Sequence, residues 1–220
     1  MSTMHASDSQ DGGTLVANLR RQHALPVFTV HRSDDVLPTL EALEEGGLSH
    51  VEVTLRTSHG LAALEAASAA GHRVGAGTVL GAEQAREAIG AGASFVVSPG
   101  LDPHVVTVCR AAHVPCIPGV ATPTEVIHAV GLGLTLLKVF PVQQLGGAGF
   151  VRALAQVFTG IEFLPSGGID AVTAREHLGV GAVAAVSGSW MIPDETVRAG
   201  RYDLVAQAAT SCASLAGARP

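Results

Sequence analysis

The chain has 220 residues, of which 13 are Lys or Arg and 19 are Asp or Glu, so its formal net charge is -6. This length suits one domain, and no run of basic residues could neutralise successive phosphates, which excludes a general nucleic-acid or anionic-membrane binder. No apolar stretch approaches the roughly 18 to 20 residues of a membrane helix.

The first residues are polar and lack the apolar segment of a secretory signal. We expect residues 1–13 to form a disordered tail and residues 14–220 to form a single domain. The chain has three cysteines, Cys109, Cys116 and Cys212. An odd number of cysteines without a secretory signal does not indicate a set of paired disulfides. A reducing cytoplasm is therefore the simplest location.

Short runs rich in branched apolar residues recur along the chain and predict eight strands. They span 25–31, 49–55, 73–78, 94–98, 114–118, 134–140, 161–165 and 182–187. Segments rich in Ala, Leu and Glu alternate with them and predict helices. These span 34–45, 60–70, 82–90, 103–112, 123–130, 149–157, 171–177 and 194–217.

Several of these helices have a plausible start signal, at Ser33, Thr122 and Asp170. Apolar strands that alternate with helices indicate a parallel sheet covered by helices. Eight such units in about 200 residues predict an α/β fold of the (β/α)8 TIM barrel type. A doubly wound open sheet is the alternative, although no GxGxxG follows the first strand.

In such a barrel the reactive groups project from the carboxyl ends of the strands. Alternation along strand two puts Glu52, Thr54 and Arg56 on one face. An isolated charge in the interior would cost several kcal/mol, so these charges need partners or a ligand. The alternative interpretation of this polar face is a purely structural ion pair between Glu52 and Arg56.

Lys138 is the only lysine of the chain and lies in the apolar run LTLLKVF. Burial penalises the charged form of an amine, and the neutral amine is the form that attacks a carbonyl. Arg stays protonated and forms no imine. Lys138 is therefore a candidate Schiff-base nucleophile, whereas a lysine that extends along an edge to solvent is the alternative.

Glycine-rich turns follow strands seven and eight, with the sequences SGG at 166–168 and SGS at 187–189. Glycine lets backbone N-H groups approach an anion, so the two turns together predict a phosphate site. Cys109, His113 and Cys116 lack a fourth nearby ligand, and no HExxH or other metal motif occurs. A metal site is not indicated.

Seven motifs in matching order resemble the KDPG/KHG class I aldolases over about residues 20 to 205. They are VEVTLRT, GAGTVL, SPGL, PCIPGVATPTE, KVFP, PSGGI and SGSWMIP. The pair EVTLRT and K-x-F-P is the most specific part. The resemblance implies a homotrimeric (β/α)8 barrel that cleaves 2-keto-3-deoxy-6-phosphogluconate (KDPG) to pyruvate and glyceraldehyde 3-phosphate without a metal or other cofactor.

The resemblance also implies the roles of individual residues. Lys138 matches the Schiff-base lysine and Glu52 the general acid and base. The pyruvate carboxylate site of the family matches Arg56, Thr78 and Pro99, and the ring beside the substrate matches Phe140. The phosphate site matches Ser166, Gly167, Gly168 and Ser189.

Three departures from the family pattern concern the aldehyde half of the substrate. Residues 142–147 lack an acidic residue, Ser166 stands where Thr is frequent, and strand one lacks the arginine of several members. Alternative substrates are 2-keto-3-deoxy-6-phosphogalactonate and 4-hydroxy-2-oxoglutarate. A phosphate-binding isomerase or epimerase, or a sensor that binds a keto acid, would be a different class of protein.

Overall fold

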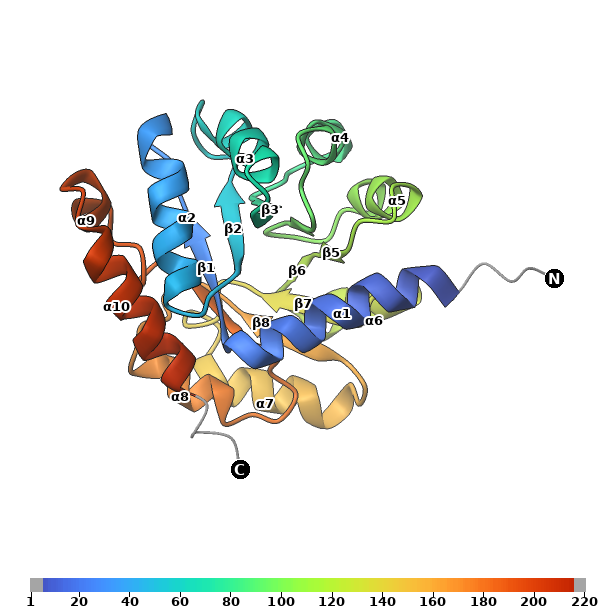
Figure 1. The fold of residues 1–220 in the computed structure, drawn as a ribbon. Coiled ribbons are helices and arrows are strands. Elements are labelled where there is room, and N and C mark those ends of the chain that lie inside the picture. Colours follow the sequence, from blue (N-terminus) through green and yellow to red (C-terminus); the bar gives the residue numbers. More distant parts are fainter. Residues whose placement is uncertain (1–5, 216–220) are drawn as a thin grey trace.

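A computed structural model describes the backbone of residues 6–215 and the side chains from residue 12 onward (Figure 1). Parallel strands alternate with helices throughout this part of the chain. The strands are β1 (Ala24–Phe28), β2 (His50–Thr54), β3 (Arg73–Gly77), β4 (Val96–Val97), β5 (Cys116–Ile117), β6 (Gly119–Val120), β7 (Leu136–Val139), β8 (Glu162–Pro165) and β9 (Val186–Gly188).

Helices precede, separate and follow these strands. They are α1 (Ala6–Gln22), the 3-10 turn η1 (Ser33–Asp35), α2 (Val36–Glu45), α3 (Gly60–Ala69), α4 (Ala82–Gly90), α5 (Pro103–Ala111), α6 (Pro123–Gly131), α7 (Gly147–Val157), α8 (Thr173–Leu178), α9 (Asp194–Arg198) and α10 (Tyr202–Ala213). None of the helices within residues 6–215 is long and apolar enough to cross a membrane.

Two parallel sheets carry the architecture. One has six strands in the order β5-β4-β3-β2-β1-β9 and curves into a half-barrel, and the other has three in the order β6-β7-β8. The first strand pairs with both its sequence neighbour β2 and the last strand β9. This order differs from that of a doubly wound sheet, in which the chain reverses direction across the sheet from a central first strand.

The two sheets lie next to each other at both of their edges. On one side β5 and β6 are consecutive pieces of chain separated by Pro118 alone. On the other side, isolated parallel bridges join Phe163 to Val183 and Ser166 to Ser187. All strands therefore point the same way, and their carboxyl ends meet at one end of the molecule.

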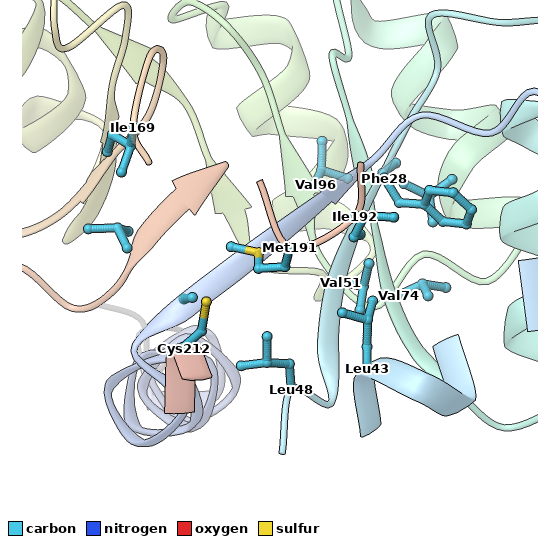
Figure 2. Packing of buried hydrophobic residues seen from close by; sticks show 14 of the residues in the cluster. Phe28, Leu43, Leu48, Val51, Val74, Val96, Ile169, Met191, Ile192 and Cys212 are labelled. Atoms are coloured by element: carbon cyan, nitrogen blue, oxygen red, sulfur yellow. The ribbon is translucent and has the colours of Figure 1, made fainter. Parts of the chain in front are cut away.

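The hydrophobic core has two layers. The larger layer lies between the strands and the helices outside them, and Figure 2 shows part of it, with Leu43 and Leu48 beside Val51 and Val74. The smaller layer groups ten buried residues of the strands, the residue before β4, the β8–β9 connection and α1. They are Leu15, Leu19, Leu25, Phe95, Val97, Ile117, Leu136, Leu164, Ala184 and Ala185. Helix α1 thus closes the amino-terminal end of the strands with Leu15 and Leu19.

The predicted tail is where the structure and the sequence expectation differ most. Residues 1–5 lie outside the described residues, but helix α1 begins at Ala6, inside the predicted tail, and no helix was predicted before the first strand. Polar composition suggested disorder, whereas Leu15 and Leu19 are 6% and 0% exposed and tie this helix to the core. Tertiary packing of an apolar face outweighs the low helix propensity of Gly12 and Gly13.

Two predicted elements differ from the structure in their bounds. The strand predicted over 114–118 contains only β5, and β6 follows beyond it, because Pro118 has no N-H to donate and interrupts the ladder. The helix predicted over 194–217 becomes α9 and α10, which are separated at Gly200, where φ is +66°. Of the predicted caps, Thr122 accepts a hydrogen bond from the Glu125 N-H, whereas Ser33 lies inside η1.

Candidate active site

Lys138 and Glu52 meet in the interior, near the carboxyl ends of the strands. The Nζ atom of Lys138 lies 3.5 Å from Oε1 of Glu52, and the residues are 7% and 1% exposed. They come from β7 and β2, which do not pair with each other. The lysine is therefore buried against a carboxylate and does not extend along an edge to solvent.

The environment of Glu52 leaves one of its oxygens open. Among the described residues Oε2 of Glu52 has no hydrogen-bond partner, although this atom is buried. A buried ion pair is weak evidence for stability, because desolvation offsets the attraction of the charges. A lysine and a carboxylate held together out of water, with one acceptor atom unused, are better suited to moving protons.

Glycine at position 77 makes room for this carboxylate. Gly77 pairs with Thr54 across β3 and β2, and a Cβ atom there would lie 2.2 Å from Oε1 of Glu52. Any larger residue would push the carboxylate away from Lys138. The motif GAGT thus has a steric reason for its second glycine.

Arg56 lies in the turn after β2 and is exposed. Its Nη2 donates to the Thr29 hydroxyl at 3.2 Å, and Thr54 donates to the same hydroxyl at 3.1 Å. The predicted alternative of an ion pair between Glu52 and Arg56 is wrong, since Glu52 pairs with Lys138. Thr54 remains on β2, while Arg56 follows the strand instead of belonging to it.

Thr78 and the segment around Pro99 follow β3 and β4. Thr78 has a positive φ of +59°, which is uncommon for a residue other than glycine and turns the chain at this end of β3. Gly119 packs against the Pro99 carbonyl, because a Cβ atom at Gly119 would lie 2.1 Å from that oxygen. Both predicted residues therefore lie at the carboxyl ends of their strands.

Phe140 directly follows β7 and is about one-third exposed, at 36%. The Nζ atom of Lys138 lies 5.6 Å from the centre of its ring. The peptide bond between Phe140 and Pro141 is cis. The partly exposed Phe140 ring therefore lies beside the Lys138 amine at the carboxyl ends of the strands.

One predicted phosphate turn lies after β8 and the other at the end of β9, where Ser189 follows the strand. Ser166 is buried and pairs with Ser187, whereas Gly168 and Ser189 are exposed. Gly167 and Gly168 have φ values of +97° and +77°, a conformation that favours glycine. A Cβ atom at Gly167 would lie 3.1 Å from the Phe140 ring, and one at Gly168 would lie 3.0 Å from Cγ of Gln143, so this turn packs closely against the segment that follows Lys138.

The sequence reasoning missed Thr29 and the contact between Gly77 and Glu52. Thr29 was part of the strand predicted over 25–31, but β1 ends at Phe28 and Thr29 follows it. A polar residue at the carboxyl end of a strand was the available signal. Ser187 belongs to the predicted SGS turn, and its buried hydroxyl has no partner among the described residues.

The opposite end of the strands holds two cavities that contain neither Lys138 nor Glu52. One of about 120 Å³ is lined in part by Cys109, His113 and Cys116, and one of about 400 Å³ by His50 and Arg73. A hydrogen bond between the two thiols lowers the pKa of Cys109 and raises the pKa of Cys116. Within residues 6–215 no group of three His, Cys, Asp or Glu residues could hold a metal ion.

Comparisons with known proteins agree with this geometry. The family model described as KDPG and KHG aldolase matches residues 15–208. The 2-dehydro-3-deoxy-phosphogluconate aldolase of Treponema pallidum is 42% identical over 197 residues, which are 87% of this chain and 92% of that protein.

Two solved structures share the fold. A KDPG aldolase from Legionella pneumophila, with pyruvate captured as a covalent carbinolamine, has a TM-score of 0.85 and 33% identity, and the match covers 89% of this chain and 96% of that one. The KDPG aldolase of Zymomonas mobilis with 3-phosphoglycerate has a TM-score of 0.84 and 34% identity, and covers 91% and 95%.

Proposed function

This chain belongs to the KDPG and KHG aldolase family, and from this membership we propose that it cleaves KDPG to pyruvate and glyceraldehyde 3-phosphate through a Schiff base on Lys138. The enzyme is then a carbon-carbon lyase. The observation that carries the proposal is the contact between the buried Lys138 amine and the Glu52 carboxylate, at 3.5 Å. The relative with pyruvate captured as a carbinolamine supports the same chemistry.

The first half of the reaction joins substrate and enzyme. The Glu52 carboxylate takes a proton from the Lys138 ammonium group, and the neutral Nζ then attacks the C2 carbonyl carbon. The carbonyl electrons move to oxygen, and that oxygen receives a proton from the nitrogen to give a carbinolamine. Glu52 protonates the C2 hydroxyl, which leaves as water, and the nitrogen lone pair forms the protonated imine. A carboxylate beside the amine can supply and recover these protons in turn.

The second half breaks the carbon-carbon bond. Glu52, directly or through a water, removes the proton of the C4 hydroxyl; the C4 oxygen becomes the aldehyde carbonyl as the C3-C4 bond breaks. The electron pair of that bond moves into the imine and gives an enamine. A proton from Glu52 to C3 restores the imine, and water hydrolyses it to pyruvate and free Lys138.

The remaining predicted residues would bind the two ends of the substrate. We propose that Arg56, Thr78 and the Pro99 segment receive the keto-acid carboxylate and that Phe140 packs beside the carbon chain. Arg56 supplies a local positive charge in a chain whose net charge is -6. The phosphate would bind at the other side of the site, to Ser166, Gly167, Gly168 and Ser189.

Membership of this family also supports a proposal about the architecture. We propose that the two sheets close into one (β/α)8 barrel in which β5 and β6 act as a single strand interrupted by Pro118. The bridges between Ser166 and Ser187 and between Phe163 and Val183 support closure at the other edge. A single domain, a homotrimer and a cytoplasmic location remain proposals, the last supported by three cysteines without a disulfide.

Steady-state kinetics would test the substrate. Pyruvate release is measured from KDPG, from its C4 epimer 2-keto-3-deoxy-6-phosphogalactonate and from 4-hydroxy-2-oxoglutarate. We expect the highest kcat/KM for KDPG. A higher value for one of the other two would keep the Schiff-base mechanism and change the substrate, whereas no turnover of any of them would overturn the proposal.

A further inference from the structure

The last residue of β2 and the turn after it are attached to the segment after β1 by three side-chain hydrogen bonds. Thr54 donates to the Thr29 hydroxyl at 3.1 Å, Arg56 donates to the same oxygen at 3.2 Å, and Thr57 donates to the Val30 carbonyl at 2.7 Å. The Thr29 oxygen is thus the meeting point of two of the three bonds. Nothing in the chemistry of the aldol reaction uses this hydroxyl.

We propose that Thr29 is a positioning residue that orients the Arg56 guanidinium toward the carboxylate of the keto acid. This inference rests on the proposed function, because that function gives Arg56 its ligand. Among the described residues Arg56 has no carboxylate partner, and its hydrogen bond to Thr29 is the contact that restrains it.

The need for such a restraint follows from the nature of arginine. A free arginine side chain has many rotamers and loses much of that freedom when it binds a ligand. A carboxylate is recognised by two parallel N-H···O bonds, which require a defined orientation of the guanidinium plane. A hydrogen bond made before the ligand arrives reduces the ordering that remains to be done on binding.

Thr29 is well built to hold this bond. Its branched Cβ restricts χ1, so the hydroxyl has few positions to choose from. Thr54, which is 0% exposed, fixes that oxygen from the interior side. A hydroxyl has two acceptor positions, and the bonds from Thr54 and Arg56 fill both of them.

The test replaces Thr29 by Val, which keeps the shape and removes the acceptor. Pyruvate is added with borohydride, and the adduct on Lys138 is quantified against pyruvate concentration. We expect the half-saturating pyruvate concentration, and KM for KDPG, to rise about 3- to 10-fold in T29V. The adduct level at saturation and kcat should stay within about 2-fold, since Lys138 and Glu52 are untouched.

Two further variants separate positioning from general destabilisation. Thr29→Ser keeps the hydroxyl and should restore the wild-type concentration dependence. Thr39→Val is the matched control, because Thr39 is fully buried on α2 and its hydroxyl has no partner among residues 6–215. It should leave both measurements unchanged. If T29V does not fold, Thr29→Cys, a weak acceptor of similar size, takes its place with the same expectation.

The Arg56→Met background decides whether Thr29 acts through Arg56. In that background Thr29→Val should cause no further rise, since there is no guanidinium left to orient. An unchanged half-saturation in T29V, or the same fold-change in both backgrounds, would overturn the positioning role. A wild-type chain that forms no adduct at all would instead overturn the proposed function, and the inference with it.

Discussion

Lys138 Nζ and Glu52 Oε1 lie 3.5 Å apart although 86 positions separate the residues in the chain. The two side chains extend from β7 and β2 into one shared interior, where both are nearly free of solvent. Each therefore sets the electrostatic environment of the other. The proposed proton transfers depend on this contact more than on any other feature of the site.

Replacement of Glu52 by Gln should remove the proton shuttle and keep the shape of the side chain. We expect kcat for KDPG cleavage to fall about 10²- to 10⁴-fold, the usual contribution of a general acid or base. The matched control is Glu162→Gln, because Glu162 pairs with Arg20 at the amino-terminal end of β8. Wild-type kcat in E52Q would contradict the role of Glu52.

The steric relation between Gly77 and Glu52 gives a second prediction. A Cβ atom at position 77 would displace the carboxylate, so Gly77→Ala should lower kcat about 10- to 100-fold, as misplacement of a reacting group does. Gly90→Ala is the control, since a Cβ atom at Gly90 meets nothing within 4 Å. If the two variants have equal activity, the close packing at Gly77 is irrelevant to catalysis.

The phosphate site is tested by the difference between two substrates. Ser189→Ala removes one hydroxyl donor and should lower kcat/KM for KDPG about 10-fold, because hydrogen bonds to charged groups are the stronger ones. 4-Hydroxy-2-oxoglutarate has no phosphate, so its kcat/KM should change little. Ser211→Ala, exposed on α10, serves as control. An equal loss for both substrates would place Ser189 elsewhere in the mechanism.

Buried histidine predicts how stability depends on pH. Burial lowers the pKa of His177 below its ordinary value of 6.5, and the neighbouring Glu176 opposes this in part. As the pH falls below about 6.5, His177 therefore binds a proton in the unfolded chain but not yet in the folded chain, and the free energy of unfolding decreases. One such proton changes the free energy of unfolding by at most about 1.4 kcal/mol per pH unit.

Thermal unfolding between pH 7.5 and pH 5 measures this effect. We expect the wild-type midpoint to be nearly constant above pH 7 and to fall below pH 6.5. His177→Gln should show a smaller fall over the same range, whereas His104→Gln, on the exposed side of α5, should follow the wild type. A fall of the same size in H177Q would mean that other groups govern the acid limb.

The alternation of strands and helices could be predicted because it follows from local patterns. The strand predicted over 49–55 contains β2 (His50–Thr54), and the helix predicted over 82–90 is α4. Both segments combine a clear apolar pattern with turn residues at their ends. The predicted ends of β1 were less accurate, and the interruption of the strand at Pro118 was not predicted. Both depend on which backbone groups find hydrogen-bond partners in three dimensions.

Proximity in the site was harder to predict than the residues themselves. The apolar run around Lys138 and the polar face of β2 suggested a reactive lysine and a carboxylate, but nothing local indicates that they touch. Thr29 was overlooked because its role comes from its contacts with Thr54 on β2 and Arg56 in the turn after β2. The start of α1 at Ala6 also depends on packing between distant residues.

Borohydride trapping with pyruvate, followed by peptide mass mapping, tests the central claim most directly. Lys138 is the only lysine in the chain, so a reduced pyruvate adduct can form only there or on the amino-terminal amine. We predict one adduct, on the peptide that contains Lys138, and its loss in Lys138→Met together with all cleavage of KDPG. A wild-type chain without that adduct, or K138M with full activity, would contradict the Schiff-base mechanism.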